Sequence, residues 1–229
     1  MKKSVFIGLI SVVVVFAALA AVFPEEALAR AGGGSASKGA GGIVGWLVAG
    51  IIAAVSAVVV YRKNRRCKAL LAEISKIDKA WDPHALAARV EETYFKIQDA
   101  WKERDQDLAR NYMSDRLYRK HKHQTDQMIK DGHKPMMFAI NLKKATIVEI
   151  TDFDDDSRDR FCALIEGSMI DYVVDEKTKA HVAGDPQDLG FREFWRFVRE
   201  GDTWVLDEID QKASMSGLVS MVAESEAVS

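Results

Sequence analysis

The stretch Phe191-Arg-Glu-Phe-Trp-Arg-Phe-Val-Arg-Glu-Gly-Asp-Thr-Trp-Val-Leu-Asp-Glu-Ile209 decides the fold. Two interleaved sets of side chains alternate along it on both sides of Gly201-Asp202, and a period of two is that of a β-strand. A Gly-Asp pair between two such runs indicates a tight hairpin turn. The stretch therefore predicts two antiparallel strands, Gly190–Arg199 and Thr203–Gln211.

Two further strands are predicted before this hairpin. The period changes from 3.6 to 2 after Pro135, so Met137–Ile150 and Arg160–Asp175 are the candidates, separated by an acidic turn. We expect Lys177–Leu189 to be a turn-rich loop, because it contains a glycine and a proline among polar residues. Together the four runs predict a meander of antiparallel strands.

Helices are predicted before the strands. Asp82 is a suitable N-cap and Pro83 fits the first turn of a helix, where its missing N–H is not needed. One apolar stripe follows at helical spacing: Leu86, Val90, Tyr94, Ile97 and Trp101. A second helix is expected from Asp105, and a third from about Ser114 to Gly132.

This order, helices first and then an antiparallel meander, predicts an α+β fold with N-terminal helices packed on a curved sheet. A helical layer over such a sheet encloses a concave space. The aromatic residues that are candidates for lining a ligand pocket there are Tyr94, Trp101, Tyr112, Phe161, Trp195, Phe197 and Trp204. The alternative for each is an ordinary place in a filled core.

The segment Ile43–Tyr61 is apolar and carries no charge. At about 1.5 Å per residue, a helix of this length crosses a hydrocarbon core about 30 Å thick, so the segment is predicted to be a transmembrane helix. Cations mark the cytoplasmic end of a span, and they follow at once as Arg62, Lys63, Arg65, Arg66 and Lys68. The alternative is a buried core helix.

The first residues have the pattern of a secretory signal. Two lysines precede the apolar run Val5–Phe23, and small-x-small sites for cleavage follow it, so 1–29 is predicted to be a signal peptide or, if uncleaved, a first span. In either case the residues after Tyr61 lie in the cytoplasm. We expect 30–42 to be a Gly/Ser-rich linker, 62–81 a basic stalk, 82–211 the globular domain and 212–229 a fraying tail.

The charge of the part from Ala69 to Ser229 and the cysteine content of the chain limit the classes of function. This part has 23 Lys and Arg residues against 32 Asp and Glu residues, a formal charge of −9. An acidic domain repels phosphate backbones, so no nucleic-acid partner is expected. Anionic lipid is expected to meet the basic stalk instead. Cys67 and Cys162 do not suggest a disulfide scaffold, and Cys67 is either an incidental juxtamembrane cysteine or an acylation site.

No motif in the chain assembles a catalytic or metal-binding centre, so no catalytic residue, metal or cofactor is predicted. His121 and His123 point about 200° apart on a helix and cannot share a metal, and we expect them on a solvated face. Asp154, Asp155 and Asp156 lack the EF-hand pattern and are expected to form a solvated turn.

Asp171-Tyr172 is a polar pair at the end of an apolar strand. Adjacent strand residues face opposite sides of a sheet, so one pocket uses both side chains only if a bulge intervenes. We expect Asp171 to pair with Arg192 or Arg196 on a neighbouring strand. The alternative is a pocket enzyme in which Asp171 or Glu193 acts as acid or base.

Several stretches between Asp82 and Gln211 carry a resemblance to a known family. They are, in order, Ile97-Gln98-Asp99-Ala100-Trp101 with Arg104-Asp105, Tyr112-Met113-Ser114-Asp115, Gly167-Ser168-Met169-Ile170-Asp171-Tyr172, Gly184, Phe191-Arg192-Glu193-Phe194-Trp195-Arg196-Phe197-Val198-Arg199, and Trp204-Val205-Leu206-Asp207-Glu208-Ile209. The resemblance is to the Tim44-like domain family. It implies a cone of helices over a curved antiparallel sheet with an apolar pocket, like the fold of nuclear transport factor two.

The resemblance also implies a membrane-associated binding module that is not an enzyme. The mitochondrial member of the family docks an import motor through a long N-terminal region, which this chain replaces with the signal-like segment and the predicted span. We therefore expect a bacterial inner-membrane relative whose soluble domain lies in the cytoplasm. It is expected to hold a lipid or other apolar ligand, or a membrane-protein partner, with an assembly or translocation factor as the alternative. The sequence does not indicate an oligomeric state.

Overall fold

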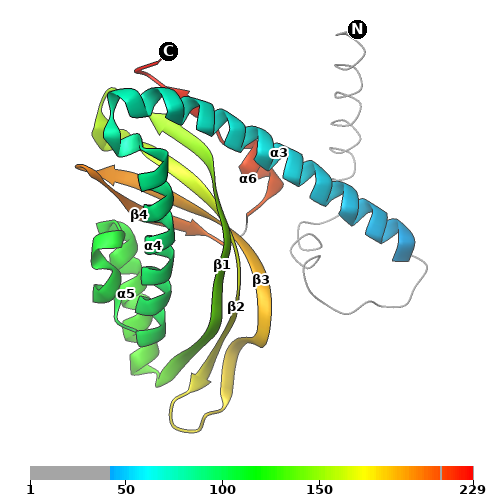
Figure 1. Ribbon diagram of the computed structural model, residues 1–229. Helices are drawn as coiled ribbons and strands as arrows, with labels where there is room; N and C mark the ends of the chain where they lie inside the picture. The colour runs from blue at the N-terminus through cyan, green and yellow to red at the C-terminus, as the bar shows by residue number, and fades with distance from the viewer. Residues whose placement is uncertain (1–41, 212, 229) are drawn as a thin grey trace. The chain divides into compact units, whose positions relative to one another are not determined.

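The computed structural model describes residues 42–211 and 213–228, and the predicted signal segment and nearly all of the predicted linker lie outside them. Helices precede strands, as the sequence predicts. The elements are α3 (Gly42–Ile77), η1 (Lys79–Trp81), α4 (Pro83–Glu103), η2 (Gln106–Tyr112), α5 (Asp115–Lys130), β1 (His133–Asp152), η3 (Asp156–Arg158), β2 (Arg160–Asp175), β3 (His181–Glu200), β4 (Thr203–Asp210), α6 (Met215–Ser220) and β5 (Ala223–Ser225). In Figure 1, α4 and α5 cover one face of the curled sheet.

Asp82 caps α4 as predicted, and Ser114, the predicted start of the third helix, caps α5. The Asp82 carboxylate accepts hydrogen bonds from the backbone N–H groups of His84 (3.0 Å) and Ala85 (2.9 Å) at the start of α4. The Ser114 hydroxyl accepts from the N–H of Leu117 at the start of α5, at 3.1 Å. It also donates to the Asp207 carboxylate on β4 at 2.6 Å, which ties α5 to the sheet.

The sheet has the strand order β4-β3-β2-β1-β5. Neighbouring strands are antiparallel except β1 and β5, which are parallel, so the sheet is mixed and the prediction of a purely antiparallel sheet is wrong in this detail. The long strand β3 also includes most of the predicted loop, since pairing with β2 extends to His181. Gly184 permits this extension: its φ is +84°, and a Cβ there would lie 2.5 Å from the Asp171 carbonyl oxygen.

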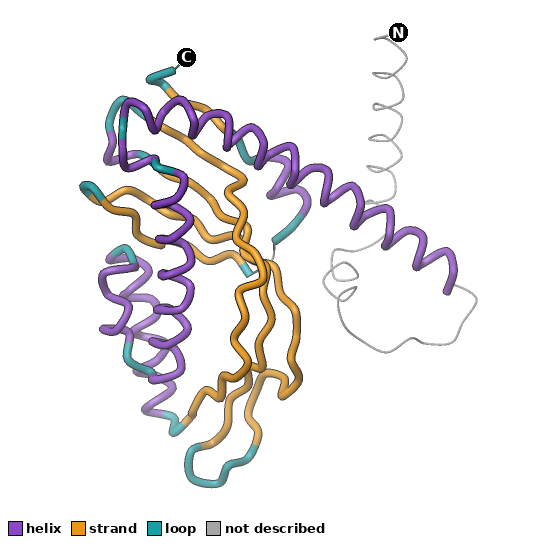
Figure 2. The backbone as a smooth tube through the Cα atoms, in the orientation of Figure 1, coloured by secondary structure: helices purple, strands orange, loops and turns teal. Residues whose placement is uncertain are grey.

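Strand β4 pairs with only one end of β3. The ladder between them runs from Phe194 to Glu200 on β3, whereas β3 pairs with β2 from His181 to Val198. Figure 2 shows the remainder of β3 as the outermost strand beside β2. Among the described residues, His181–Glu193 therefore has a strand on one side only.

The chain forms two units, Met1–Gly50 and Ile51–Ser229. The described part of the chain has no helix that is long and apolar enough to cross a membrane, so the predicted span Ile43–Tyr61 is not confirmed. It is the first part of the 36-residue helix α3. Within the second unit, Ser56 and Val60 of this helix are buried against the domain, and the Arg192 guanidinium donates to the Ser56 hydroxyl at 3.4 Å.

The core occupies both faces of the sheet. On the concave face, α4 and η2 pack against Phe161, Ile165 and Phe197. On the convex face, a smaller cluster joins α3 and α6 to the sheet through Val60, Val148, Cys162, Leu164, Phe194, Leu218 and Met221. Alternate residues of β2 serve the two faces, as the period of two requires.

The predicted stalk and tail both contribute to this core. Cys67, Leu71, Ile74 and Trp81 are buried, and the Trp81 indole N–H donates to the Asp152 carboxylate at 2.9 Å. The tail forms α6 and then β5, rather than fraying as expected, because its apolar side chains cover the convex cluster. The Lys63 ammonium donates to two tail carbonyls, those of Val219 and Met221.

Arg199 fastens the start of the domain to the sheet. Its guanidinium contacts three carboxylates, those of Asp78, Asp156 (3.1 Å) and Asp159 (3.1 Å). The Arg199 side chain is 5% exposed and that of Asp159 is fully buried. The three acids are close enough to one another to hold a metal ion, but the Arg199 guanidinium already contacts all three, so the cluster is an ion-pair network.

Candidate functional site

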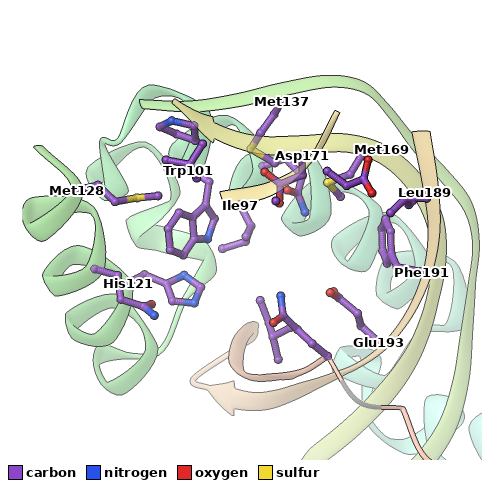
Figure 3. A pocket seen from close by; sticks show the side chains of 18 of the residues that line it. Ile97, Trp101, His121, Met128, Met137, Met169, Asp171, Leu189, Phe191 and Glu193 are labelled. Atoms are coloured by element: carbon purple, nitrogen blue, oxygen red, sulfur yellow. The ribbon is translucent and has the colours of Figure 1, made fainter. Parts of the chain in front are cut away.

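A cavity of about 700 Å³ lies between the concave face of the sheet and helices α4 and α5. Figure 3 shows side chains reaching it from both layers: Ile97, Trp101, His121 and Met128 from the helices, and Met137, Met169, Asp171, Leu189, Phe191 and Glu193 from the sheet. This volume is within the range of about 300–1,000 Å³ that is usual for small-molecule sites. We call this space the cavity.

The helical wall of the cavity comes from the ends of two apolar stripes. On α4 the stripe Leu86, Val90, Tyr94 is buried in the core, and its continuation Ile97 and Trp101 reaches the cavity. On α5, His121 and Met128 follow Leu117 on one face, and the His121 ring packs on Trp101 with ring centroids 5.2 Å apart. Helical spacing therefore places an aromatic and an imidazole ring side by side.

The sheet wall is built by alternate residues of β2 and β3. Met169, Asp171 and Val173 line the cavity from β2, and Leu189, Phe191, Glu193 and Trp195 line it from β3. Gly167 makes room for one of these side chains, because a Cβ on Gly167 would lie 2.6 Å from Cζ of Phe191. The glycine in this motif thus lets the Phe191 ring lie across the neighbouring strand.

Asp171 and Glu193 are two of the carboxyl groups that line the cavity. Asp171 is exposed, and partial desolvation by its surroundings raises the pKa of its carboxyl group above the usual range. Burial also raises the pKa of Glu193, and the nearby Asp171 charge acts in the same direction, although the Trp195 indole N–H donates to the Glu193 carboxylate at 2.8 Å. Among the described residues, no cation lies within ion-pair distance of either acid. The cavity therefore favours a ligand that brings a positive charge or a proton.

The predicted ion pair of Asp171 is wrong. Arg192 pairs with Glu166 at 3.2 Å, and Arg196 approaches Glu208 at 3.9 Å. These side chains belong to the alternate positions of their strands, whereas Asp171 faces the cavity. The prediction that Asp171 and Tyr172 face opposite sides is consistent with the structure, since Tyr172 stacks with His181 outside the cavity.

His121 is buried, so the prediction of a solvated face is wrong for this residue, while His123 is exposed as expected. Burial lowers the pKa of His121 to about 4, with a further contribution from the charge of Lys120. The neutral imidazole has a buried Nδ1 without a hydrogen-bond partner in the protein. The helical wall thus offers an uncharged polar group beside the ring of Trp101.

Of the seven aromatic residues predicted to line a pocket, Trp101 and Trp195 line the cavity. The other five do not line it. Tyr94, Phe161, Phe197 and Trp204 pack in the core, where the rings of Phe161 and Phe197 stack 4.7 Å apart. Tyr112 lies at the surface and its hydroxyl donates to Glu92 at 2.6 Å.

Sequence reasoning missed the methionines and Leu189. Met128, Met137 and Met169 line the cavity beside the tryptophans. The alternation of β2 places Met169 on the concave face, and helical spacing from Leu117 and His121 places Met128 inward. The positions of both methionines in the cavity could therefore have been predicted from the sequence. The position of Leu189 could not have been predicted, because the sequence of its segment is typical of a loop.

The predicted membrane-contact residues lie on the second half of α3. Arg62, Arg65, Arg66 and Lys68 are exposed, whereas Lys63 is half-buried under the tail. Cys67, among them, is fully buried, and burial raises the pKa of its thiol to about 12. The thiol is therefore out of reach of an acylating enzyme in the folded chain.

Comparison with known proteins gives one family. The model of the Tim44-like domain matches residues 67–211. No curated protein matches the sequence. Twelve chains of solved structures match, among them the crystal structure of the intermembrane space region of the chloroplast protein ARC6. That match has 14% identity and a TM-score of 0.41, and covers 57% of this chain and 97% of that chain.

Proposed function

Because the chain belongs to the Tim44-like domain family, we propose that it is a membrane-associated binding module rather than an enzyme. The observation that carries the proposal is the cavity of about 700 Å³ between the helices and the sheet. Aromatic, aliphatic and methionine side chains form about half of its lining, and polar or charged side chains form most of the rest. The apolar side chains can hold the apolar part of a ligand or of a partner segment, and the polar groups can orient it.

The ligand we propose is apolar over most of its length: an acyl chain, or a segment of a membrane-protein partner. Met128, Met137 and Met169 support this, because the unbranched thioether side chain adapts to ligands of different shape. In this role the protein acts as an accessory factor that holds its ligand close to a membrane. No cofactor is needed for holding a ligand.

We propose that α3 attaches the domain to the cytoplasmic face of a bacterial inner membrane. Trp46, Ile51, Val58 and Tyr61 are large apolar side chains of this helix that are exposed. The exposed cations Arg62, Arg65, Arg66 and Lys68 follow them along the helix. Such cations contribute about 1 kcal/mol each near an anionic leaflet, so anionic phospholipid is the proposed surface.

A pocket enzyme is the second candidate, because of the two carboxyl groups in the cavity. Asp171 and Glu193 both have raised pKa values and no cationic partner among the described residues, which suits a general acid or base. Tyr172 is not available as an oxyanion donor, since it stacks with His181 outside the cavity. A binding module therefore accounts for more of the cavity than a catalytic site does.

Native mass spectrometry of the full chain extracted from its own membrane tests the proposed function. We expect a co-purifying adduct on the wild type and its loss in Met169→Trp, because the bulkier indole intrudes into the space that the ligand would occupy. The matched control is Ile129→Trp on α5, a residue that is 52% exposed and does not line the cavity. An adduct that persists equally in both variants would contradict the proposal.

Flotation of the full chain with liposomes tests the membrane surface. We expect stronger binding with cardiolipin than without it, and loss of this difference when Arg62, Arg65, Arg66 and Lys68 are all changed to Gln. The size of the difference should fall as salt is added, because exposed charges are screened. Equal recovery of the wild type with both kinds of liposome would remove anionic lipid from the proposal.

A further inference from the structure

The edge of β3 beside the cavity is open. β4 ends its ladder at the pair of Phe194 and Asp210, and beyond this point β3 continues with β2 on its other side only. After Gln211 the chain turns to the convex face, where Ala213 and Met215 pack against the cluster around Phe194. The described chain thus leaves unpaired backbone N–H and C=O groups along β3, which are a template for another strand.

Only part of this edge is regular enough to accept a strand. Pairing with β2 is continuous from Leu189 to Glu193, while a register shift interrupts it between Leu189 and Asp185, where Pro186 lies. Bulges and proline protect edge strands from unwanted pairing. The stretch Leu189–Glu193 has neither device, and we call it the open edge.

The open edge is also a wall of the cavity. Leu189, Phe191 and Glu193 point into the cavity, as Figure 3 shows. A strand added here would continue the line of β4 and cover the cavity from the side. Its alternate side chains would then enter the space beside Trp101 and Met169.

The charges of the lining residues favour one kind of ligand in the cavity over others. Asp171, Asp185 and Glu193 line it, and Lys120 is the cation among its described lining residues. An anionic headgroup is disfavoured by this excess of carboxylates, and a cationic side chain is favoured. Backbone groups along the edge further favour a polypeptide, since an acyl chain has nothing to pair with them.

We propose that the open edge Leu189–Glu193 binds an extended peptide segment as an added β-strand, with a Lys or Arg side chain of the segment placed between Asp171 and Glu193. Apolar side chains of the same segment occupy the cavity next to Trp101, Met137 and Met169. The proposal rests on the proposed function, because it names the partner for the same cavity. It differs from lipid holding in requiring both backbone pairing and a cation.

Fluorescence anisotropy on the full chain in nanodiscs tests this proposal with defined probes. The probe is a labelled peptide of about nine residues, a usual strand length, with alternating Val and Thr and a central Lys. One matched peptide has Glu in place of Lys, and another carries N-methyl groups on alternate residues, which remove strand hydrogen bonds and keep the composition. The protein variants are the wild type, Asp171→Asn with Glu193→Gln, and Ile129→Trp.

We expect the Lys peptide to bind at least about tenfold more tightly than either matched peptide, since each loses charge pairing or backbone pairing. The double variant should reduce the preference for Lys over Glu to about twofold or less. Ile129→Trp should behave as the wild type. Equal binding of all three peptides, no binding of the Lys peptide, or an unchanged preference in the double variant would overturn the proposal.

The two proposals fail in different ways. If the wild type carries a lipid adduct that Met169→Trp removes, but the Lys peptide does not bind, the cavity holds lipid and the peptide proposal is wrong. If neither the adduct nor the peptide binds, the proposed function is wrong as well. Binding of the Lys peptide that Met169→Trp weakens supports both.

Discussion

The two ends of the concave face differ in how tightly they are packed, although the same helix, α4, covers both. At the packed end, Val90 and Tyr94 of α4 belong to one buried cluster with Phe161, Phe197 and Trp204. At the cavity end, Ile97 and Trp101 of the same stripe meet methionines and the open edge. The apolar stripe of a helix therefore indicates which face of the helix turns towards the sheet. The side chains of the sheet opposite that stripe determine whether the space between the two layers is filled.

The first test of this comparison removes a large side chain from the packed end. Phe161 is 1% exposed and its ring stacks on Phe197. We expect Phe161→Ala to lower the free energy of unfolding by about 3–5 kcal/mol, because the lost contacts leave a void that neighbours cannot fill. Denaturant unfolding of the full chain measures it.

Met169→Ala is the matched change at the cavity end. Met169 is half-buried and already borders open space, so we expect a loss of about 1 kcal/mol or less. Equal losses for Phe161→Ala and Met169→Ala would show that the two ends are packed alike.

A second substitution tests whether the ion-pair network of Arg199 stabilises the packed end. We expect Arg199→Met to cost about 3 kcal/mol, because the fully buried Asp159 carboxylate is left without its cation. The loss should shrink when Asp159→Asn is added, since the charge that needed compensation is gone. A double variant no more stable than Arg199→Met, by denaturant unfolding, would contradict the assigned role of the ion-pair network.

A third prediction uses pH at the cavity end. The pKa of His121 is lowered to about 4 in the folded chain, so the folded state binds fewer protons than the unfolded state between that value and 6.5. Stability is therefore lost as pH falls through this window, by at most about 1.4 kcal/mol per pH unit. His121→Phe should remove this part of the acid sensitivity. An unchanged pH profile in the variant would contradict the burial of His121.

The smallest expected effect is that of Glu193→Gln. The pKa of Glu193 is raised by burial, so the folded state holds its proton more firmly than the unfolded state does. The carboxylate therefore costs stability at neutral pH, and this cost shrinks as pH falls through the folded pKa and is gone below the unfolded pKa. We expect Glu193→Gln to be more stable than the wild type at pH 7, by less than about 1 kcal/mol, and to lose this advantage in acid. Denaturant unfolding at both pH values checks the sign.

Much of the fold is predictable from local patterns. The caps at Asp82 and Ser114 and the alternation on both sides of Gly201 give the helices and strands in order. The length of β3 is not predictable in this way, because Pro186 and Gly184 read as a loop, and only pairing with β2 makes their segment a strand. The role of the predicted tail is similarly set by distant contacts, such as those of Leu218 and Met221 with the sheet.

The candidate site was predictable only in part. Spacing places Trp101 and Trp195 inward, and both line the cavity. Spacing also places Tyr94 and Phe161 inward, yet both are buried in the core and do not line the cavity. Whether an inward side chain contacts the opposite layer depends on the curl of the sheet and on side chains that are distant in the sequence. His121 was misjudged for a related reason: its lysine neighbours point elsewhere on α5 and say little about its own burial.

The most direct test of the central claim, that the cavity end binds a ligand and the packed end does not, is hydrogen exchange on the full chain. The chain is measured with its co-purifying ligand and again after detergent exchange has removed it. We expect exchange in Leu189–Glu193 to accelerate at least about tenfold on removal, while the amides of Phe161 and Phe197 stay unchanged. Unchanged exchange at Leu189–Glu193, or the same acceleration at both ends, would contradict the claim.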